Sequence, residues 1–281
     1  MYKILKKEIL NPTVTRMVVD APFVAKHAKA GQFIILRVDD QGERIPLTIA
    51  DANRGEGTIT IIFQVVGKTT MQLNQLQVGE EICDFVGPLG KPSEIFKGKV
   101  CVIGGGVGCA IAYPIAKAFH LAGADVTTIV GFRNKDLLIL EEEFKAVSNH
   151  YYLMSDDGSA GEKGLVTNKL EDLIDEAEHF DQVVAIGPII MMKFVSLLTK
   201  KHHIPTVVSM NPIMIDGTGM CGGCRLKVGN KIKFACVDGP DFDGHLVDFD
   251  EAMARNDAYQ AFEKQERDST CNLFAKEVNY E

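Results

Sequence analysis

Short runs of apolar and β-branched residues, broken by Gly and Asp turns, fill the first third of the chain. Two of these runs lie at residues 33–38 and 58–66. Strands at such spacing are typical of a small antiparallel barrel. We therefore expect residues 1–97 to form a β-barrel domain.

The pattern changes at Lys99, where buried strands begin to alternate with helical stretches. This alternation predicts a parallel sheet with helices on both faces, formed by residues 98–210. After Met210 the pattern gives way to glycine, cysteine and short strands, so residues 211–281 are expected to form a small third region that ends in a helical segment near residues 250–267. The strands expected in the parallel sheet lie at residues 100–103, 126–130, 151–154, 183–186 and 206–209.

The composition is that of a globular protein with an acidic surface. Apolar residues make up 46% and charged residues 24% of the 281 positions, and the formal net charge is −8. Scattered Lys and Arg argue against nucleic acid or an anionic membrane as a partner. No apolar run approaches the roughly eighteen residues that cross a bilayer, and the N-terminus is too charged for a signal peptide. A cytoplasmic location is expected.

A glycine-rich turn directly follows the first strand of the α/β region and opens a helix. Glycines let backbone N–H groups approach a pyrophosphate, and the start of a helix favours negative charge. The same residues could also form a plain tight turn. A second turn, Gly187-Pro188, ends the fourth strand and is open to the same two interpretations. The residues of the first turn are Gly104, Gly105, Gly106, Val107 and Gly108.

The end of the second strand bears on the choice between NAD and NADP. Arg133 could bind an adenosine 2′-phosphate, but the acidic run at residues 141–143 would oppose that charge. This favours NAD over NADP. The acidic run could equally be the solvated start of a helix.

Two motifs in the barrel region are suited to a phosphorylated cofactor. Arg44 begins an Arg-x-Pro-Leu-Thr motif, in which the Arg can contact a diphosphate and the Thr hydroxyl a flavin ring nitrogen. A Gly-x-Thr-Thr motif then precedes a helical run and offers N–H groups and hydroxyls to phosphate. By chemistry alone each motif could be a surface Arg or a turn Gly. Their residues are Arg44, Pro46, Leu47, Thr48, Gly67, Thr69 and Thr70.

Seven cysteines in such a chain favour metal or redox chemistry over disulfides. Cys83, Cys101 and Cys109 lie among apolar residues and are expected in the core or a pocket wall, and Cys271 is isolated in a polar tail. The other three form the pattern Asp216-x4-Cys221-x2-Cys224-x11-Cys236.

The spacing of this cysteine group matches plant-type [2Fe–2S] loops, whose first position is normally Cys and is Asp216 here. Structural zinc is the alternative, but a zinc site needs a fourth ligand and no His is suitably spaced. A [2Fe–2S] cluster on Cys221, Cys224 and Cys236 is favoured. Asp216 is the expected fourth ligand, although it could be a turn residue with an external or solvent ligand completing the iron.

The order of these motifs along the chain resembles the ferredoxin–NADP reductase superfamily, in which an FAD-binding barrel precedes a nicotinamide-binding domain. The resemblance implies that Arg44, Pro46, Leu47 and Thr48 contact the flavin. It implies that Gly67, Thr69 and Thr70 lie at the FAD phosphates. It also makes the turn at residues 104–108 and the Gly187-Pro188 turn the pyridine-nucleotide site.

With the cysteine loop, the whole chain resembles the electron-transfer subunits of two-subunit dihydroorotate dehydrogenases. It also resembles the small subunits of NADH-dependent ferredoxin:NADP oxidoreductases, also called sulfide dehydrogenases. The former carry four cysteines in the loop and the latter replace the first with aspartate. Asp216 therefore assigns the chain to the latter.

The resemblance implies FAD, a [2Fe–2S] cluster and NAD(H) as cofactors, with no catalytic side-chain acid or base. It also implies a heterodimer with a larger flavoprotein that oxidises NADPH. That subunit sends one electron of each pair to ferredoxin and the other through this chain to NAD. Two alternatives are the same electron relay in a dihydroorotate dehydrogenase and a zinc-stapled nucleotide-binding regulator.

Overall fold

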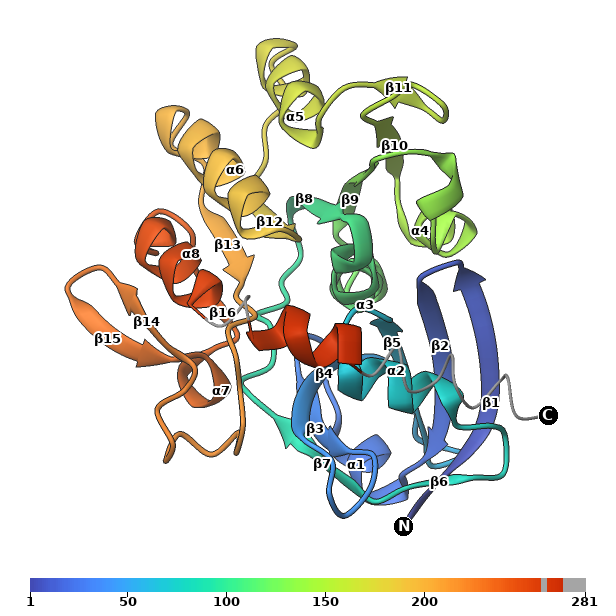
Figure 1. The fold of residues 1–281 in the computed structure, drawn as a ribbon. Coiled ribbons are helices and arrows are strands. Elements are labelled where there is room, and N and C mark those ends of the chain that lie inside the picture. The colour runs from blue at the N-terminus through green and yellow to red at the C-terminus, as the bar shows by residue number, and fades with distance from the viewer. Residues whose placement is uncertain (259–261, 270–281) are drawn as a thin grey trace.

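A computed structural model describes residues 1–258 and 262–269 of the chain (Figure 1). Two sheets of seven strands each and one two-stranded sheet make up the strand structure of these residues. The predicted architecture of a barrel, a parallel α/β sheet and a small C-terminal part is confirmed. Cys271 and the rest of the expected tail at 270–281 lie outside the described residues. No helix in the described parts is long and apolar enough to span a bilayer.

The N-terminal sheet is antiparallel throughout, in the order β6-β1-β2-β5-β4-β3-β7. Its two edge strands follow one another along the chain, with only Cys83 between them, so the sheet curls until its edges meet. Alternate strand positions fill the interior, where Phe63 and Phe85 are almost fully buried. The strands are β1 (Tyr2–Asn11), β2 (Val14–Asp20), β3 (Phe33–Arg37), β4 (Arg44–Asn53), β5 (Thr58–Gln64), β6 (Glu81–Ile82) and β7 (Asp84–Leu89), with helices α1 (Pro22–His27) and α2 (Lys68–Gln75) between them.

The second large sheet has the order β11-β10-β9-β8-β12-β13-β16, and its strands from β11 to β13 are parallel. The strands expected from the sequence are all present. They are β8 (Lys99–Gly105), β9 (Asp125–Phe132), β10 (His150–Ser155), β11 (Glu162–Lys163), β12 (Gln182–Ile186) and β13 (Thr206–Ser209), with helices η1 (Gly106–Gly108), α3 (Cys109–Leu121), η2 (Lys135–Leu137), α4 (Glu141–Val147), α5 (Val166–Asp175) and α6 (Ile189–Lys201).

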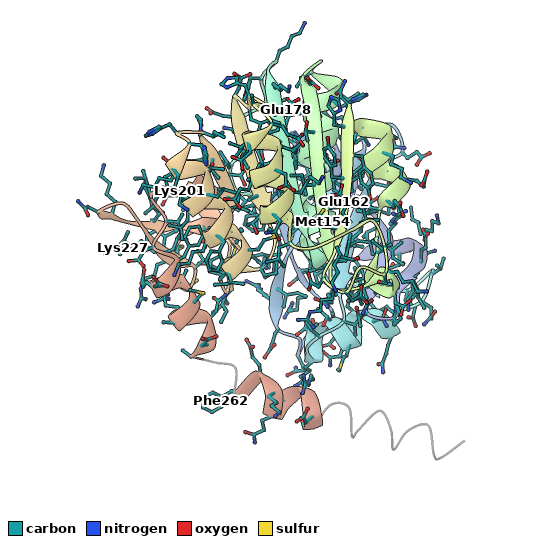
Figure 2. The ribbon with its side chains drawn as sticks, turned by 90° about the horizontal axis from the view of Figure 1, so that it is seen from above. Met154, Glu162, Glu178, Lys201, Lys227 and Phe262 are labelled. Carbon is teal, nitrogen blue, oxygen red and sulfur yellow. The ribbon has the colours of Figure 1, made fainter. Side chains whose placement is uncertain are left out.

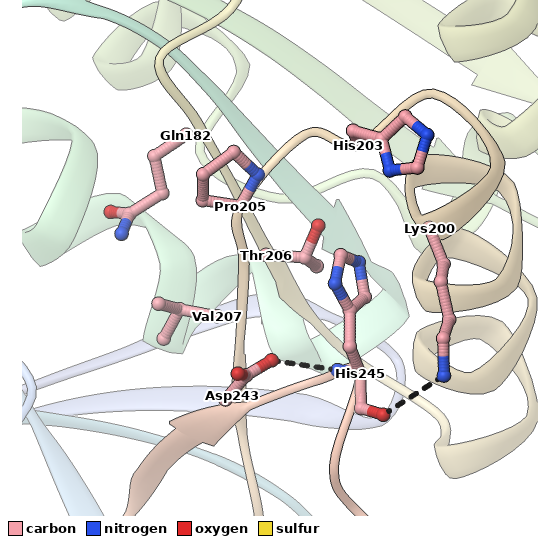
Figure 3. Close-up of a pocket in the computed structure, with 8 residues that line it drawn as sticks. All are labelled: Gln182, Lys200, His203, Pro205, Thr206, Val207, Asp243 and His245. Atoms are coloured by element: carbon pink, nitrogen blue, oxygen red, sulfur yellow. Dashed lines mark hydrogen bonds between the residues drawn. The ribbon is translucent and has the colours of Figure 1, made fainter.

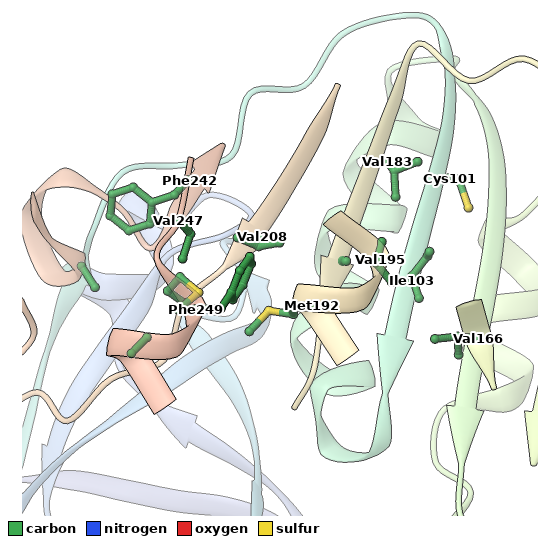
Figure 4. Close-up of a cluster of buried hydrophobic side chains, with 14 of the residues drawn as sticks. Cys101, Ile103, Val166, Val183, Met192, Val195, Val208, Phe242, Val247 and Phe249 are labelled. Atoms are coloured by element: carbon green, nitrogen blue, oxygen red, sulfur yellow. The ribbon is translucent and has the colours of Figure 1, made fainter. Parts of the chain in front are cut away.

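Helices cover both faces of this sheet, as the alternating pattern predicts. α3 and α4 lie on the face toward the barrel, and their apolar residues share one core with Val14, Ala50 and Ile62 of the barrel. α5 and α6 cover the other face, where Val166 and Val195 pack on Ile103 (Figure 4). Burying a Val or Ile side chain contributes roughly 1.5–3 kcal/mol, so both layers stabilise the sheet substantially.

The C-terminal part is joined to the parallel sheet by β16, which was not predicted. β16 pairs antiparallel with β13, and Phe242, Val247 and Phe249 extend the core of the α5–α6 face (Figure 4). Helix 262–269 lies beyond α8, and its Glu266 carboxylate is 3.4 Å from Lys68 Nζ at the start of α2; Phe262 on this helix is exposed (Figure 2). The elements of this part are β14 (Arg225–Val228), β15 (Lys231–Phe234), α7 (Ala235–Asp238), β16 (Asp241–Asp243) and α8 (Phe249–Asp257).

Candidate functional site

The two glycine turns lie against each other at the carboxyl ends of β8 and β12. A Cβ atom on Gly108 would be 2.6 Å from both Gly187 Cα and the Ile186 carbonyl oxygen. Real Cβ atoms essentially never come that close, so only glycine fits at position 108 in this arrangement. Gly106 has φ +54°, a backbone conformation that other residues rarely adopt. The first turn thus depends on glycine for two separate reasons.

The geometry of these turns suits an anionic ligand. Parallel sheets bind ligands beyond the carboxyl ends of their strands, and β8 and β12 are neighbours at the centre of this one. The first turns of η1 and α3 leave backbone N–H groups without partners inside the helix, and the helix dipole favours negative charge there. Val107 is half-buried in the first turn, and Pro188 is the N-cap residue of α6 in the second.

The acidic run at residues 141–143 makes ion pairs with Lys145 and with a residue of the barrel. It forms the first turn of α4, where Glu141 and Glu142 pair with Lys145 at 2.9 and 2.8 Å. Glu143 pairs with Arg16 of the barrel at 2.6 Å. The run therefore serves as a charged helix start and a contact between the domains. These contacts fit the alternative interpretation of the run as the start of a helix.

A narrow pocket lies where the barrel, the parallel sheet and the cysteine loop meet. Pro46 and Thr48 of the Arg-x-Pro-Leu-Thr motif line it. Leu47 points the other way and packs against the barrel core, as alternation along a strand requires. The remaining lining residues are Phe33, Ile111, Ser209, Met210, Asn211, Met214 and Pro240.

These remaining residues were missed by the sequence reasoning. Ser209 ends the last parallel strand and Met210 follows it, and the rule that ligands bind at the carboxyl ends of strands could have indicated both. Ile111 lies in the first turn of α3, directly after the predicted glycine turn. Phe33 and Pro240 carry no such signal, because only the packing of distant segments brings them to the pocket.

Arg44 begins β4 and its side chain is about half exposed, at 49%. Its nearest acidic partner is Asp84, at 3.9 Å, and Arg37 already binds that carboxylate at 2.8 Å. An exposed pair at such a distance contributes little to stability. The Arg44 guanidinium is therefore available to an anionic ligand at the barrel surface.

The Gly-x-Thr-Thr motif begins α2, with Gly67 as its N-cap residue. The Thr70 hydroxyl accepts the Val66 and Gly67 N–H groups, each at 3.0 Å. The buried Thr69 hydroxyl donates to Glu43 at 3.2 Å. Both hydroxyls are thus bonded within the protein, so the backbone N–H groups of the first helical turn are the groups that remain for a phosphate.

The cysteine loop places its four candidate ligands in two pairs. Cys224 and Cys236 are buried, with their sulfur atoms 3.2 Å apart. Asp216 accepts the backbone N–H of Cys221 at 3.0 Å, and the exposed Cys221 thiol also bonds its carboxylate. Among the described residues no three His, Cys, Asp or Glu side chains converge to hold a single metal ion. The arrangement fits a centre with two metal atoms, each bound by one pair.

Backbone hydrogen bonds and burial shift the pKa values of two of these ligands, Asp216 and Cys236. The N–H groups of Thr218 and Cys221 lower the pKa of Asp216 to about 2, so it is an ionised carboxylate at neutral pH. Burial, and then the hydrogen bond with Cys224, raise the pKa of Cys236 to about 12. A metal must therefore displace the thiol proton. Once charged, the sulfurs have N–H donors at hand: Gly223 to Cys221 at 3.5 Å and Cys236 to Cys224 at 3.4 Å.

The loop also packs directly on the barrel. A Cβ on Gly217, next to Asp216, would be 2.7 Å from Leu89 and 2.8 Å from Ile35, on strands β7 and β3. Met214 of the same loop lines the narrow pocket. The cysteine loop, the barrel motif and the helix of the glycine turn are therefore adjacent.

A wider cavity of about 600 Å³ lies at the opposite end of the parallel strands (Figure 3). Gln182 and Thr206, which begin β12 and β13, line it together with Lys200, His203 and His245. The His245 ring bonds Thr199 at 3.0 Å. This cavity is at the amino ends of the strands, away from both glycine turns and from the cysteine loop. It is not the site that the motifs predict.

Comparisons with known proteins agree on the kind of protein this is. The family model of the iron–sulfur cluster binding domain of dihydroorotate dehydrogenase B matches residues 211–248. A Thermotoga maritima homologue of the dihydroorotate dehydrogenase B (NAD(+)) electron transfer subunit is 49% identical over 94% of this chain and 93% of its own length. The corresponding subunit of Fusobacterium nucleatum is 33% identical over 80% of this chain and 89% of its own.

A solved structure gives a close match in three dimensions. It comes from a study of flavin-based electron bifurcation in the NADH-dependent reduced ferredoxin-NADP oxidoreductase. The matched chain is 46% identical, with a TM-score of 0.91, and the match covers 96% of this chain and 97% of that one.

Proposed function

The chain belongs to the family of dihydroorotate dehydrogenase B electron-transfer subunits, and from this membership we infer that it transfers electrons between NAD(H), FAD and a [2Fe–2S] cluster. The observation that carries this function is the narrow pocket. It is lined at once by the barrel motif, by the helix of the glycine turn and by the loop of the cysteine group. Three elements that carry the cofactor motifs meet at this pocket, and such proximity suits a relay of electrons.

We further propose that the chain is the small subunit of an electron-bifurcating NADH-dependent ferredoxin:NADP oxidoreductase. The 46% identity to the chain of such an enzyme, over nearly the full length of both, supports this. Relatives named as dihydroorotate dehydrogenase B electron transfer subunits, two of them as probable ones, are 31–35% identical. A dihydroorotate dehydrogenase partner is the second candidate.

Electron-transfer subunits work with another subunit, and so does this chain. We propose that its partner is a larger flavoprotein with iron–sulfur clusters, and that ferredoxin exchanges electrons with that partner. Neither nucleic acid nor a membrane has a place in this scheme. The exposed side of the cysteine loop, with Cys221 at the surface, is where electrons would leave or enter.

The residues of the chain bind and align the cofactors. Pro46 and Thr48 hold the flavin ring at the pocket, and Arg44 and the N–H groups that begin α2 bind its diphosphate. The two glycine turns would bind the dinucleotide at its pyrophosphate, at the start of the helix whose Ile111 lines the same pocket. Bound FAD would supply the chemistry that connects the two-electron carrier NADH to a cluster, because a flavin reacts in two-electron and in one-electron steps whereas a cluster carries single electrons. No side chain need act as a general acid or base.

The pairing within the cysteine loop assigns the cluster ligands. Cys224 and Cys236 would hold one iron, and Asp216 and Cys221 the other. Thiolates select iron–sulfur or zinc, and the ionised Asp216 supplies a harder oxygen ligand. Two separate pairs fit a two-iron cluster better than a single tetrahedral zinc, which requires all its ligands around one point.

An absorption spectrum of the purified chain tests the proposed function. Flavin bands with a broad charge-transfer shoulder, and two irons and two sulfides per chain, are the expected result. A colourless protein that contains one zinc per chain would show the zinc-stapled regulator instead. Co-purification distinguishes the two candidate partners, because they differ in fold and size.

Replacing Arg44 by alanine should weaken FAD binding without unfolding the chain. A charge-assisted hydrogen bond to the diphosphate contributes about 1.5–3 kcal/mol, which corresponds to roughly ten- to a hundredfold in the FAD dissociation constant. Fluorescence titration of the apoprotein with FAD measures it. Arg54→Ala is the matched control, because Arg54 is exposed on the same barrel and its hydrogen bond within the described residues is to the Ala28 carbonyl. Equal FAD affinity in both variants would contradict the assignment.

Replacing Asp216 by cysteine should keep the cluster and change its electron paramagnetic resonance spectrum, because thiolate is a softer and more covalent ligand than carboxylate. Asp216→Asn is the control for the loop: its amide oxygen can replace one of the two carboxylate oxygens, which separately accept the Thr218 and Cys221 N–H groups, and it introduces no thiolate. If Asp216 is only a turn residue, Asp216→Cys and Asp216→Asn leave the wild-type spectrum unchanged.

A further inference from the structure

A carboxyl group that the electron relay does not use lies directly behind the pocket wall. Asp241 begins β16 and is paired with Ser209 of β13 in the antiparallel register. Ser209 lines the pocket, and so does Pro240, which precedes Asp241. The Met210 N–H donates to the Pro240 carbonyl at 2.9 Å, which fixes this edge of the sheet. Two direct neighbours of Asp241, its cross-strand partner Ser209 and the preceding residue Pro240, therefore line the pocket.

Asp241 also connects the sheet edge to the barrel. The Ser93 hydroxyl donates to Asp241 Oδ2 at 2.5 Å, and the Ser93 N–H donates to the Ala30 carbonyl at 3.0 Å. Ser93 lies in the segment that joins the two domains. A side chain at Gly31, next to Ala30, would collide with the Ser93 hydroxyl. The glycine therefore allows Ser93 to approach the barrel and bond the Ala30 carbonyl. The carboxyl, the linker and the barrel form one chain of hydrogen bonds.

The surroundings of the carboxyl do not favour a negative charge. Asp241 Oδ1 is buried and has no hydrogen-bond partner among the described residues. Burial raises the pKa of Asp241, and the Ser93 and Ser209 hydroxyls lower it by less. A buried charge without an ionic partner costs several kcal/mol. A neutral carboxylic acid avoids that cost and can donate a hydrogen bond as well as accept one.

Among the described residues, no cationic side chain pairs with Asp241. The titratable side chains of the linker are exposed, β13 carries none, and Asp238 of α7 is bonded to the Phe234 N–H and to Lys233. Asp243, on the same strand as Asp241, is exposed and accepts the His245 N–H at 2.9 Å. The linker groups are Lys91, Glu94 and Lys97.

We propose that Asp241 is a positioning residue that remains a neutral carboxylic acid, joins the barrel to the sheet edge, and fixes Ser209 in the pocket wall. This rests on the proposed function, in which flavin and nicotinamide meet at that pocket. Asp241 touches neither cofactor site itself. Its role is to hold the two domains at the spacing that the pocket requires, and a charge at this position would separate them.

Infrared spectroscopy of the assembled holoenzyme tests the protonation state. The carbonyl stretch of a protonated carboxyl group should be present in the wild type at neutral pH and absent in Asp241→Asn. Asp243→Asn is the matched control, with the same substitution on the same strand at an exposed residue, and it should retain the band. A spectrum in which Asp241→Asn loses no such band would overturn the proposal.

The pH dependence of stability gives an independent measurement. The folded chain keeps a proton on Asp241 that the unfolded chain releases once the pH exceeds the ordinary value of 3.8. Wild-type stability should therefore fall as the pH rises from that value to the raised pKa. Asp241→Asn has no carboxyl group at this position, so its stability should not decrease with pH for this reason. The melting temperature of Asp241→Asn minus that of the wild type should therefore increase across this pH range. A constant difference between the two would contradict a raised pKa.

Steady-state kinetics test the positioning role. Asp241→Asn keeps a neutral side chain of the same size, and its KM for NADH should stay within about twofold of wild type. Asp241→Ala leaves the Ser93 hydroxyl without its acceptor, and its KM should rise about tenfold. Equal KM values for Asp241→Ala and Asp243→Asn would overturn the positioning role. Absence of flavin from the wild-type chain would instead refute the proposed function. The infrared and stability measurements do not use NADH, so they test Asp241 separately from that function.

Discussion

Replacing Gly108 by alanine should abolish most of the NADH-dependent activity while the chain keeps its flavin. The new Cβ would lie 2.6 Å from the Gly187 backbone, so the two glycine turns must move apart. A displacement of about 1 Å in a binding site can cost on the order of a hundredfold in rate. We expect kcat/KM for NADH, with an artificial electron acceptor, to fall at least that far.

The flavin bands serve as the internal check on this variant. The FAD motifs belong to the barrel, whereas Gly108 contacts the turn after β12, so flavin content should change little. Overpacking typically costs 1–3 kcal/mol, which lowers the melting temperature without preventing folding. Gly55→Ala is the control, because the nearest atom to a Cβ at that exposed turn is 3.5 Å away. Normal NADH kinetics in Gly108→Ala would exclude this turn as the dinucleotide site.

The second large effect concerns the chain without its partner. Loaded with FAD and iron, the isolated chain should oxidise NADH with artificial acceptors but should not couple NADPH oxidation to ferredoxin reduction. Splitting an electron pair requires a second flavin and further carriers toward ferredoxin. The described cysteines outside the loop are Cys83, Cys101 and Cys109. Cys101 and Cys109 are fully buried, and Cys83 is bonded to Asp40 at 3.4 Å.

Reconstitution measures this prediction directly. The lone chain and the chain with its larger partner are compared in one assay of NADPH-driven ferredoxin reduction, with NADH oxidation by a dye as the control for an intact FAD site. Rapid ferredoxin reduction by the lone chain would show that the pair is split within this subunit. The proposed division of work between the subunits would then be wrong.

The sequence predicts best those features that depend on local pattern. The strands of the parallel sheet and the glycine turn between β8 and α3 are recognisable from neighbouring residues, and all are present. β16 was not predicted, because its three residues gain their structure from pairing with β13. The strands that close the barrel were not predicted either, because β6 and β7, on either side of Cys83, gain their structure from pairing with β1 and β3. In both cases the stabilising partner is distant in the sequence.

The candidate site shows the same division. Asp216 and the cysteines are visible as a spaced motif, but their division into two pairs depends on how the loop folds against the barrel. The assignment of the Thr69 and Thr70 hydroxyls to phosphate remains a prediction, and the structure shows them bonded internally. The ion pair between the acidic run at residues 141–143 and Arg16 was not predicted, because Arg16 lies in the other domain.

The core that α3 and α4 share with the barrel has a consequence for how this chain can be divided. Val14, Ala50 and Ile62 are buried against residues of the other domain, and Lys117 pairs with Asp51 at 2.9 Å across the same contact. A cut between residues 97 and 98 would expose an apolar surface on both halves. The predicted boundary between residues 97 and 98 separates two folds, but the shared core means that we expect the two domains to unfold together. Gene fusions and chimaeras of this family should therefore exchange both domains as one unit.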